Sequence, residues 1–251
     1  MSRRMRHQAG LGLVELMVAM VLSLFLLAGI VTVFVSTKQT YAEQQAMAAL
    51  QENQRFAGSM LGNVIQQGGY FPYSSTIPTN LIAFPANGTF TTAGQFIYGT
   101  GSTIVVRYVA APSGASSSPM INCNGGSNAS SLAVVTVNVI SVDPAQSELE
   151  CQVNGNTPQP VISPLANMGY NPLGGGITGL QVLYGVAALS GGSVRQYLTA
   201  AEVQAQNAWM QVRTLVVTLD FANPLYNAAH PNGQPQTLPF TRVIDLQNVV
   251  K

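Results

Sequence analysis

Apolar side chains fill the first part of the chain. Most residues between 11 and 35 are apolar, and Glu15 is the only charged residue between Arg6 and Lys38. A helix of about 20 apolar residues is long enough to cross a lipid bilayer. The pattern predicts a membrane-spanning helix. Its single carboxylate is a candidate functional group, because an acid inside a membrane costs about 2.5 to 3.5 kcal/mol.

The stretch after residue 37 continues the helix with a different pattern. The first proline of the chain is Pro72, and apolar residues recur at steps of three and four between residues 47 and 64. This spacing is that of an amphipathic helix. We therefore expect one helix of about 55 residues, about 85 Å long, which ends at Gly68 and Gly69.

Beyond residue 70 the pattern is that of β-strands separated by Gly, Pro, Ser and Asn. The expected strands lie at residues 96–98, 103–109, 132–142, 178–186, 212–221 and 237–246. A second helix is expected at residues 199–210, because Thr199 and Glu202 have the spacing of a capping box. A long helix followed by strands predicts an α+β fold, with an antiparallel sheet on the apolar face of the helix.

Charged residues are sparse, at 8% of the sequence, compared with about a quarter in typical soluble domains. The formal charge is +1, and Arg3, Arg4 and Arg6 precede the apolar stretch. We interpret these arginines as a positive-inside signal, which places the bulk of the chain on the far side of the membrane. The other basic residues are scattered, so the sequence does not indicate nucleic-acid binding.

The start of the apolar stretch resembles a known processing signal. Gly10-Leu11-Gly12-Leu13-Val14-Glu15 is similar to the class III signal of type IV pilins and type II secretion pseudopilins. The resemblance implies that a prepilin peptidase cleaves between Gly10 and Leu11 and that the new amino group of Leu11 is methylated. That family usually has phenylalanine first and a small hydroxyl residue second, where this chain has Leu11 and Gly12. The alternative is an ordinary signal anchor with an isolated acid.

The resemblance also gives Glu15 a role, because it becomes the fifth residue of the cleaved chain. Cleavage creates an α-amino group, whose ordinary pKa is about 7.7–8.0, at Leu11. When neighbouring helices are staggered along their axes, the amino group of one subunit can meet Glu15 of another. In lipid, this attraction offsets part of what each charge loses on leaving water. We therefore expect Glu15 to set the register of assembly.

Further segments are similar to PilW-type minor pilins. The resemblance lies in "LQENQRFA" at 50–57 and "IQQGGY" at 65–70, and then in residues 179–186, 212–219 and 242–248. It implies a minor pilin with a type IV pilin-like fold that primes or initiates pilus assembly and lies near the pilus tip, with roles in attachment and twitching motility. The implied partners are the prepilin peptidase, other minor pilins, the major pilin, a tip adhesin and the inner membrane.

The expected organisation has four parts: a cleaved leader at 1–10, a transmembrane or filament-core helix at 11–37, its amphipathic continuation at 38–70, and a periplasmic or extracellular β-rich domain at 71–251. A minor pseudopilin of a type II secretion system is the main alternative, since its anchor would look the same. A signal-anchored periplasmic enzyme or binding module is the more remote one.

The only two cysteines, Cys123 and Cys151, fall in the region expected to be exported, where disulfides persist. A bridge between them would close a loop of about 29 residues and add about 3.5 kcal/mol in the chain-entropy model. Two unpaired thiols are the alternative.

The sequence offers no constellation for catalysis, metal binding or a cofactor. His7 falls in the leader and His230 is isolated, and there is no C-x-x-C pair or nucleophile motif. Glu148 and Glu150 would share one face of a strand, which is better explained as an exposed charged edge than as a pair of catalytic carboxylates. Trp209 is expected in the core. We therefore expect a structural protein rather than an enzyme.

Overall fold

The computed structural model describes residues 12–114, 120–165, 171–188, 192–230 and 233–248. It divides the chain into two compact units, Met1–Gln44 and Gln45–Lys251. Helix α1 (Leu13–Gln67) provides the helical part of the first unit and the first element of the second.

Within the second unit, α1 buries one face. Its buried residues recur at helical spacing: Ala46, Leu50, Ala57, Gly58, Leu61, Gly62, Val64 and Ile65. The helix ends at Gln67, and Gly69 follows with a φ of +77°, a conformation that glycine adopts without strain. The amphipathic helix and its glycine stop, both expected from the sequence, are thus present.

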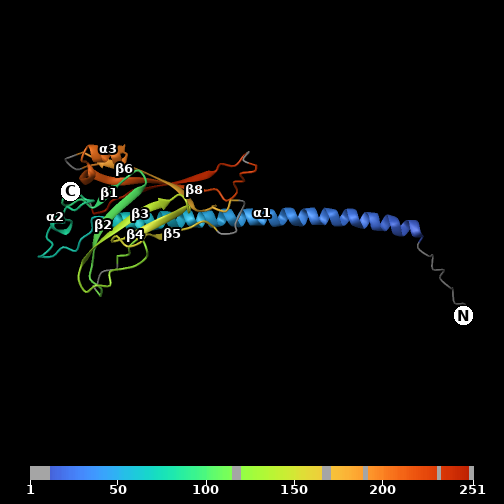
Figure 1. Ribbon diagram of the computed structural model, residues 1–251, viewed down its shortest axis with the longest axis horizontal. Coiled ribbons are helices and arrows are strands. Elements are labelled where there is room, and N and C mark those ends of the chain that lie inside the picture. The colour runs from blue at the N-terminus through green and yellow to red at the C-terminus, as the bar shows by residue number, and fades with distance from the viewer. Residues whose placement is uncertain (1–11, 115–119, 166–170, 189–191, 231–232, 249–251) are drawn as a thin grey trace. The chain divides into compact units, whose positions relative to one another are not determined.

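The first sheet has five antiparallel strands in the order β1-β2-β3-β4-β5. They are β1 (Ile97–Gly99), β2 (Thr103–Ala110), β3 (Val134–Asp143), β4 (Glu148–Val153) and β5 (Gln159–Ile162). The strands follow chain order, so each pairs with the preceding one (Figure 1). Every residue of β2 after Thr103 is buried, as expected for a strand that is covered on both faces.

The second sheet has four antiparallel strands in the order β7-β6-β8-β9. They are β6 (Ile177–Ala187), β7 (Val194–Leu198), β8 (Val212–Ala222) and β9 (Thr237–Asp245). The described part of the unit also contains three short helical elements: α2 (Asn80–Ala83), α3 (Ala200–Ala205) and η1 (Trp209–Gln211). Buried residues of α1 and of both sheets form one hydrophobic core.

The α+β fold expected from the sequence is confirmed, with two differences. The antiparallel strands form two sheets instead of one, and β4, β5 and β7 were not predicted. The predicted helix at residues 199–210 is shorter. It ends at Ala205, and Asn207 has a φ of +50°, which an α-helix cannot contain. Its capping box between Thr199 and Glu202 is present, and Trp209 is buried in the core.

Candidate assembly site

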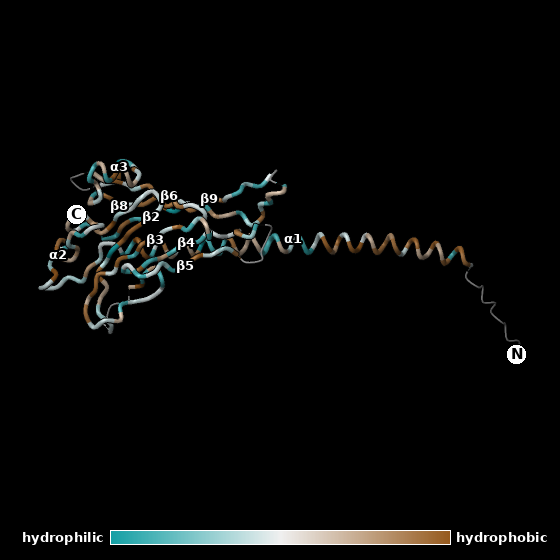
Figure 2. The backbone as a smooth tube through the Cα atoms, viewed as in Figure 1, coloured by the Kyte–Doolittle hydropathy of each residue, from teal (hydrophilic) through white to brown (hydrophobic). Residues whose placement is uncertain are grey.

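The first unit exposes its apolar side chains. Between residues 13 and 35 the large hydrophobic residues are 50–77% exposed. Figure 2 shows hydrophobic colouring along this part of α1. By length and composition, α1 is the one helix in the described part of the chain that could cross a membrane, and none of its most apolar window is buried. An apolar surface of this extent needs lipid or another protein to cover it.

Glu15 lies in the first turn of this helix and is exposed. The backbone N–H groups of Glu15 and Leu16 donate to the carbonyl oxygen of Gly12, at 3.0 and 3.2 Å. A carboxylate here is favoured by the positive end of the helix dipole. Among the described residues, no side chain forms an ion pair or hydrogen bond with the Glu15 carboxylate. Gly10 and Leu11, the predicted cleavage and methylation positions, lie outside the described residues.

The hydroxyl groups in the apolar stretch are bonded within the helix itself. The Oγ of Ser23 donates to the carbonyl of Met20 at 2.8 Å, and the Oγ1 of Thr32 donates to the carbonyl of Ala28 at 2.9 Å. These bonds satisfy the two hydroxyls without water. The stretch can therefore enter an apolar environment without leaving either donor unpaired, and Glu15 is its only charged group.

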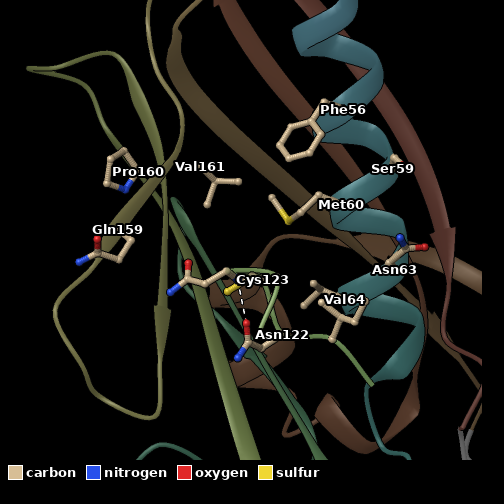
Figure 3. Close-up of a pocket in the computed structure, with 13 residues that line it drawn as sticks. Phe56, Ser59, Met60, Asn63, Val64, Asn122, Cys123, Gln159, Pro160 and Val161 are labelled. Atoms are coloured by element: carbon tan, nitrogen blue, oxygen red, sulfur yellow. Dashed lines mark hydrogen bonds between the residues drawn. The ribbon is translucent and has the colours of Figure 1, made fainter. Parts of the chain in front are cut away.

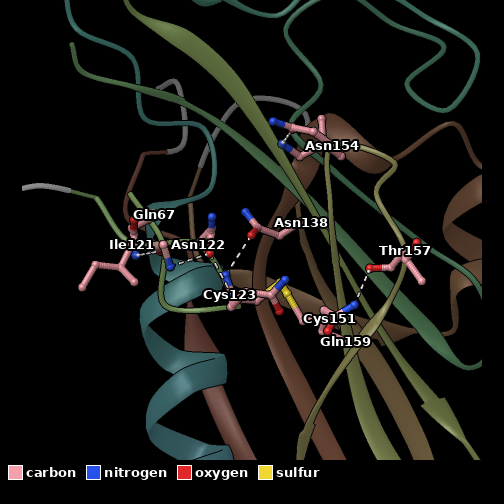
Figure 4. Close-up of a disulfide and its surroundings, with 12 residues drawn as sticks. Gln67, Ile121, Asn122, Cys123, Asn138, Cys151, Asn154, Thr157 and Gln159 are labelled. Atoms are coloured by element: carbon pink, nitrogen blue, oxygen red, sulfur yellow. Dashed lines mark hydrogen bonds between the residues drawn. A yellow bond between two sulfur atoms is a disulfide. The ribbon is translucent and has the colours of Figure 1, made fainter. Parts of the chain in front are cut away.

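In the second unit, a disulfide joins Cys123 to Cys151 on β4, with 5.8 Å between the Cα atoms (Figure 4). The Cys123 N–H donates to Oδ1 of Asn138 on β3 at 2.9 Å. The side-chain amide of Gln67, the last residue of α1, donates to the carbonyl of Ile121 at 3.3 Å. The loop around Cys123 is thus fixed to two strands and to the end of α1.

This loop forms one wall of an open groove of about 510 Å³. In Figure 3, Phe56, Met60 and Val64 of α1 face Pro160 and Val161 of β5. All of the lining residues are uncharged. The groove therefore lacks the ionisable groups that general acid–base catalysis would require.

Arg107 on β2 is one of the largest fully buried side chains in the described part of the protein. Its Nε donates to the carbonyl of Gln95 at 2.8 Å, and its Nη1 and Nη2 donate to the carbonyls of Pro85 and Phe84 at 2.9 and 3.2 Å. The guanidinium also lies over the ring of Phe90, 4.1 Å from the centroid. Burial lowers the pKa of Arg107 to about 10, so it keeps its charge at neutral pH. Arg107 thereby fastens the segment between α2 and β1 to the sheet.

The other candidates from the sequence lie apart. Glu148 and Glu150 are on β4, where the Glu148 carboxylate accepts a hydrogen bond from Oγ of Ser163 at 2.7 Å. His230 is exposed in a turn, and His7 lies outside the described residues. No group of three His, Cys, Asp or Glu residues in the described ranges is placed to hold a metal ion.

Comparison with known proteins bears on the first unit. Residues 5–31 match the family model of the prokaryotic N-terminal methylation motif. No curated protein and no solved structure matches the chain. The motif is typical of type IV pilins and pseudopilins, and it implies processing by a prepilin peptidase and association with a membrane or pilus. The segment that carries the exposed apolar helix and Glu15 is therefore similar to the N-terminal methylation segment of those proteins.

Proposed function

We propose that the chain is a minor pilin, a structural subunit that primes or initiates assembly of a type IV pilus and lies near its tip. The observation that carries this proposal is the helix of residues 13–35, which exposes apolar side chains around the single carboxylate of Glu15 and overlaps the methylation motif. The resemblance of residues 50–57 and 65–70 to PilW-type minor pilins favours a role in a pilus over one in a type II secretion system.

In this proposal the four parts of the chain have distinct tasks. Residues 1–10 are a leader that the peptidase removes, and residues 11–37 lie in the inner membrane before assembly and in the filament core afterwards. Residues 38–70 continue the helix into the domain of residues 71–251. That domain lies in the periplasm first and on the pilus after assembly, where it contacts other minor pilins, the major pilin and a tip adhesin.

The task of Glu15 follows from its surroundings. A carboxylate that stays ionised in an apolar environment needs a nearby cation to offset its desolvation, and residues 12–37 contain no basic residue. The α-amino group of Leu11 in a neighbouring subunit would supply that cation. A subunit in the wrong axial position would leave both charges unpaired, so the pair selects the correct position.

Removing the charge of Glu15 tests this role. Glu15→Gln keeps the size of the side chain but cannot form the ion pair, and we expect it to be processed normally yet recovered far less in sheared pili and in complexes with other pilins. Glu150→Gln, the same exchange on β4, is the matched control and should behave as wild type. Wild-type recovery of Glu15→Gln would contradict the proposed register.

A minor pseudopilin of a type II secretion system is the alternative, because the methylation motif is common to both classes. The two roles predict different losses in a strain that lacks the gene. A minor pilin is required for surface pili and twitching, whereas a pseudopilin is required for secretion of folded enzymes. Loss of secretion with normal piliation would replace the first proposal with the second.

A further inference from the structure

Strand β9 lies at the edge of the second sheet, and no other strand in the described part of the chain pairs with its outer side. We propose that the outer edge of β9, at residues 241–245, binds an extended strand of a different polypeptide, which adds to the sheet as a fifth strand. This is a second interaction surface, independent of the Glu15 register.

The hydrogen-bonding phase of β9 follows from the bonds at its two ends. The Leu246 N–H donates to the carbonyl of Arg213, and the Asn223 N–H donates to the carbonyl of Gln236. The register between these points has no irregularity, so the even-numbered residues of β9 direct their backbone groups to β8. The N–H groups of Thr241, Val243 and Asp245 then point away from β8. No hydrogen bond from these three is found within the described part of the chain.

The outer face of the second sheet carries an apolar row that stops at this edge. Leu183 of β6 lies opposite Val216 of β8, and Val216 lies opposite Val243. Leu183 is 41% exposed and Val243 58% exposed. An added strand with an aliphatic residue opposite Val243 would extend the row by one position and cover the most exposed side chain in it.

Arg242 supplies a charge for recognition. Its guanidinium lies against α1 at Gly58 and Gly62, where the helix has no side chains. A Cβ atom added to Gly58 would be 3.0 Å from Nη1, and one added to Gly62 would be 3.2 Å from Nη2. The side chain is exposed, and within the described ranges it has no ion pair or hydrogen bond. A carboxylate on an added strand would pair with Arg242, and a basic residue would pair with Asp245 on the opposite face.

The direction of β9 argues against a second copy of this chain as the occupant. Phe240 and Arg242 lie against Gly58, and Asn248 donates to the carbonyls of Gln66 and Gly68. Strand β9 therefore runs parallel to α1 within this unit. A two-fold β9–β9 pair would be antiparallel, and it would place residue 45 of each copy at opposite ends of the dimer. Two chains that are anchored in one membrane, as the function above implies, must come from the same side.

These features specify the occupant. From its amino end, an antiparallel partner strand would have a basic residue opposite Asp245, an apolar residue opposite Ile244 and a β-branched aliphatic residue opposite Val243. An acidic residue opposite Arg242 and a threonine or valine opposite Thr241 would follow. A peptide with the core Lys-Ile-Val-Glu-Thr matches this chemistry. Main-chain hydrogen bonds would provide affinity, and the two charges would provide register.

The test is binding of that peptide, fluorescently labelled, to the full chain in detergent micelles, measured by anisotropy. Wild type should bind it saturably. Val243→Pro removes an outward N–H without removing a bond to β8 and should weaken binding at least about tenfold, whereas Val243→Thr keeps the N–H and should bind almost as well. Thermal unfolding of both variants checks that the sheet is intact.

A charge exchange tests the proposal without relying on proline. Arg242→Glu should weaken binding of the original peptide, and a peptide with the core Lys-Ile-Val-Lys-Thr should recover it on this variant. The proposal is overturned if binding is absent up to about 1 mM peptide, or if neither the proline nor the charge exchange alters it. A dimer of the full chain that Val243→Pro abolishes would also overturn it, because the occupant would then be a second copy. The Glu15 register would stand in each case.

Discussion

Glu15 and Arg107 are both charged groups close to apolar side chains, one in each unit of the chain, and they differ in their polar partners. Arg107 is fully buried, and three backbone carbonyls of its own chain accept its hydrogen bonds. Glu15 is exposed among apolar side chains, and no described side chain pairs with it. The second unit therefore supplies the hydrogen-bond partners of its buried charge, whereas in our proposal Glu15 pairs with an amino group of another subunit.

The apolar side chains show the same difference. In the second unit α1 packs Leu50, Leu61 and Ile65 into the core, at 1% exposure or less. Between residues 13 and 35 the same helix buries none. One helix thus serves two environments. Its first part is suited to lipid or neighbouring helices, and its later part is the central element of a folded unit.

A matched pair of leucine substitutions tests this difference directly. Leu61 is 1% exposed and Leu26 is 69% exposed. Leu61→Ala should lower the free energy of unfolding of the second unit by about 4 kcal/mol, because it leaves a cavity. Leu26→Ala should change it by less than about 0.5 kcal/mol. Denaturant titration of the full chain in detergent measures the free energy of unfolding of both variants. Equal decreases would contradict the difference in burial between the two parts of α1.

The disulfide is confined to the second unit, so its removal should leave the first unaffected. The bridge has a sequence separation of 28 residues, and the chain-entropy model gives about 3.5 kcal/mol for a loop of this length. The double variant Cys123→Ser with Cys151→Ser should lower the free energy of unfolding by about this amount, and with it the unfolding midpoint. Its insertion into membranes should be retained. An unchanged midpoint would show that the bridge does not stabilise the unit.

Replacement of Arg107 tests how the buried charge is accommodated. Arg107→Met leaves three backbone carbonyls without their donors, two of them in buried hydrogen bonds. We expect the free energy of unfolding to fall by about 2 kcal/mol, since methionine recovers part of the packing. Arg195→Met, at an exposed position on β7, should have almost no effect. If Arg107→Met were more stable than wild type, the hydrogen bonds from Arg107 to the three carbonyls would not offset the free energy lost by burying the charge.

The smallest expected effect lies at the start of α3. The Glu202 carboxylate accepts hydrogen bonds from the backbone N–H and the hydroxyl of Thr199, at 2.7 and 2.8 Å, and these bonds lower the pKa of Glu202. Because the folded pKa lies below the unfolded one, this stabilisation is present above the ordinary pKa of glutamate and is lost as the pH falls through the folded pKa.

Thr199→Ala should therefore lower the unfolding midpoint slightly at neutral pH and flatten its fall under acid conditions, whereas Thr199→Ser should keep both. Melting curves of the three proteins across that pH range measure the effect. A pH dependence that is identical in Thr199→Ala and wild type would show that these bonds do not contribute.

Much of the fold could be predicted from local pattern. Residues close together in the sequence determine the end of α1 before Gly68 and Gly69, the capping box at Thr199 and six of the nine described strands. The division into two sheets could not be predicted, because it depends on pairing between distant strands such as β6 and β8. Strand β5 was missed because Pro160 lies within it, where the strand is at the edge of its sheet and the proline is tolerated.

Less of the candidate site than of the fold could be predicted from the sequence. Glu15 was predicted because it is a single charge in an apolar stretch. Arg107 was not predicted, although it is likewise the single charge in the apolar segment that forms β2. The partners of Arg107 could not be predicted, because the three carbonyls that accept its hydrogen bonds belong to residues 84, 85 and 95, which are distant in the sequence. The free edge of β9 likewise depends on the order of strands.

We propose that the first unit is the processed N-terminal segment of a pilin-type subunit, and the mass of the mature chain tests this proposal most directly. Intact-mass and terminal-peptide spectrometry of the membrane-extracted protein should show a chain that starts at Leu11 and carries one added methyl group. The variant Gly10→Val should retain residues 1–10 and lack the methyl group. A wild-type chain that still starts at Met1 or Ser2 would contradict the account, because Glu15 would then have no neighbouring amino group with which to pair.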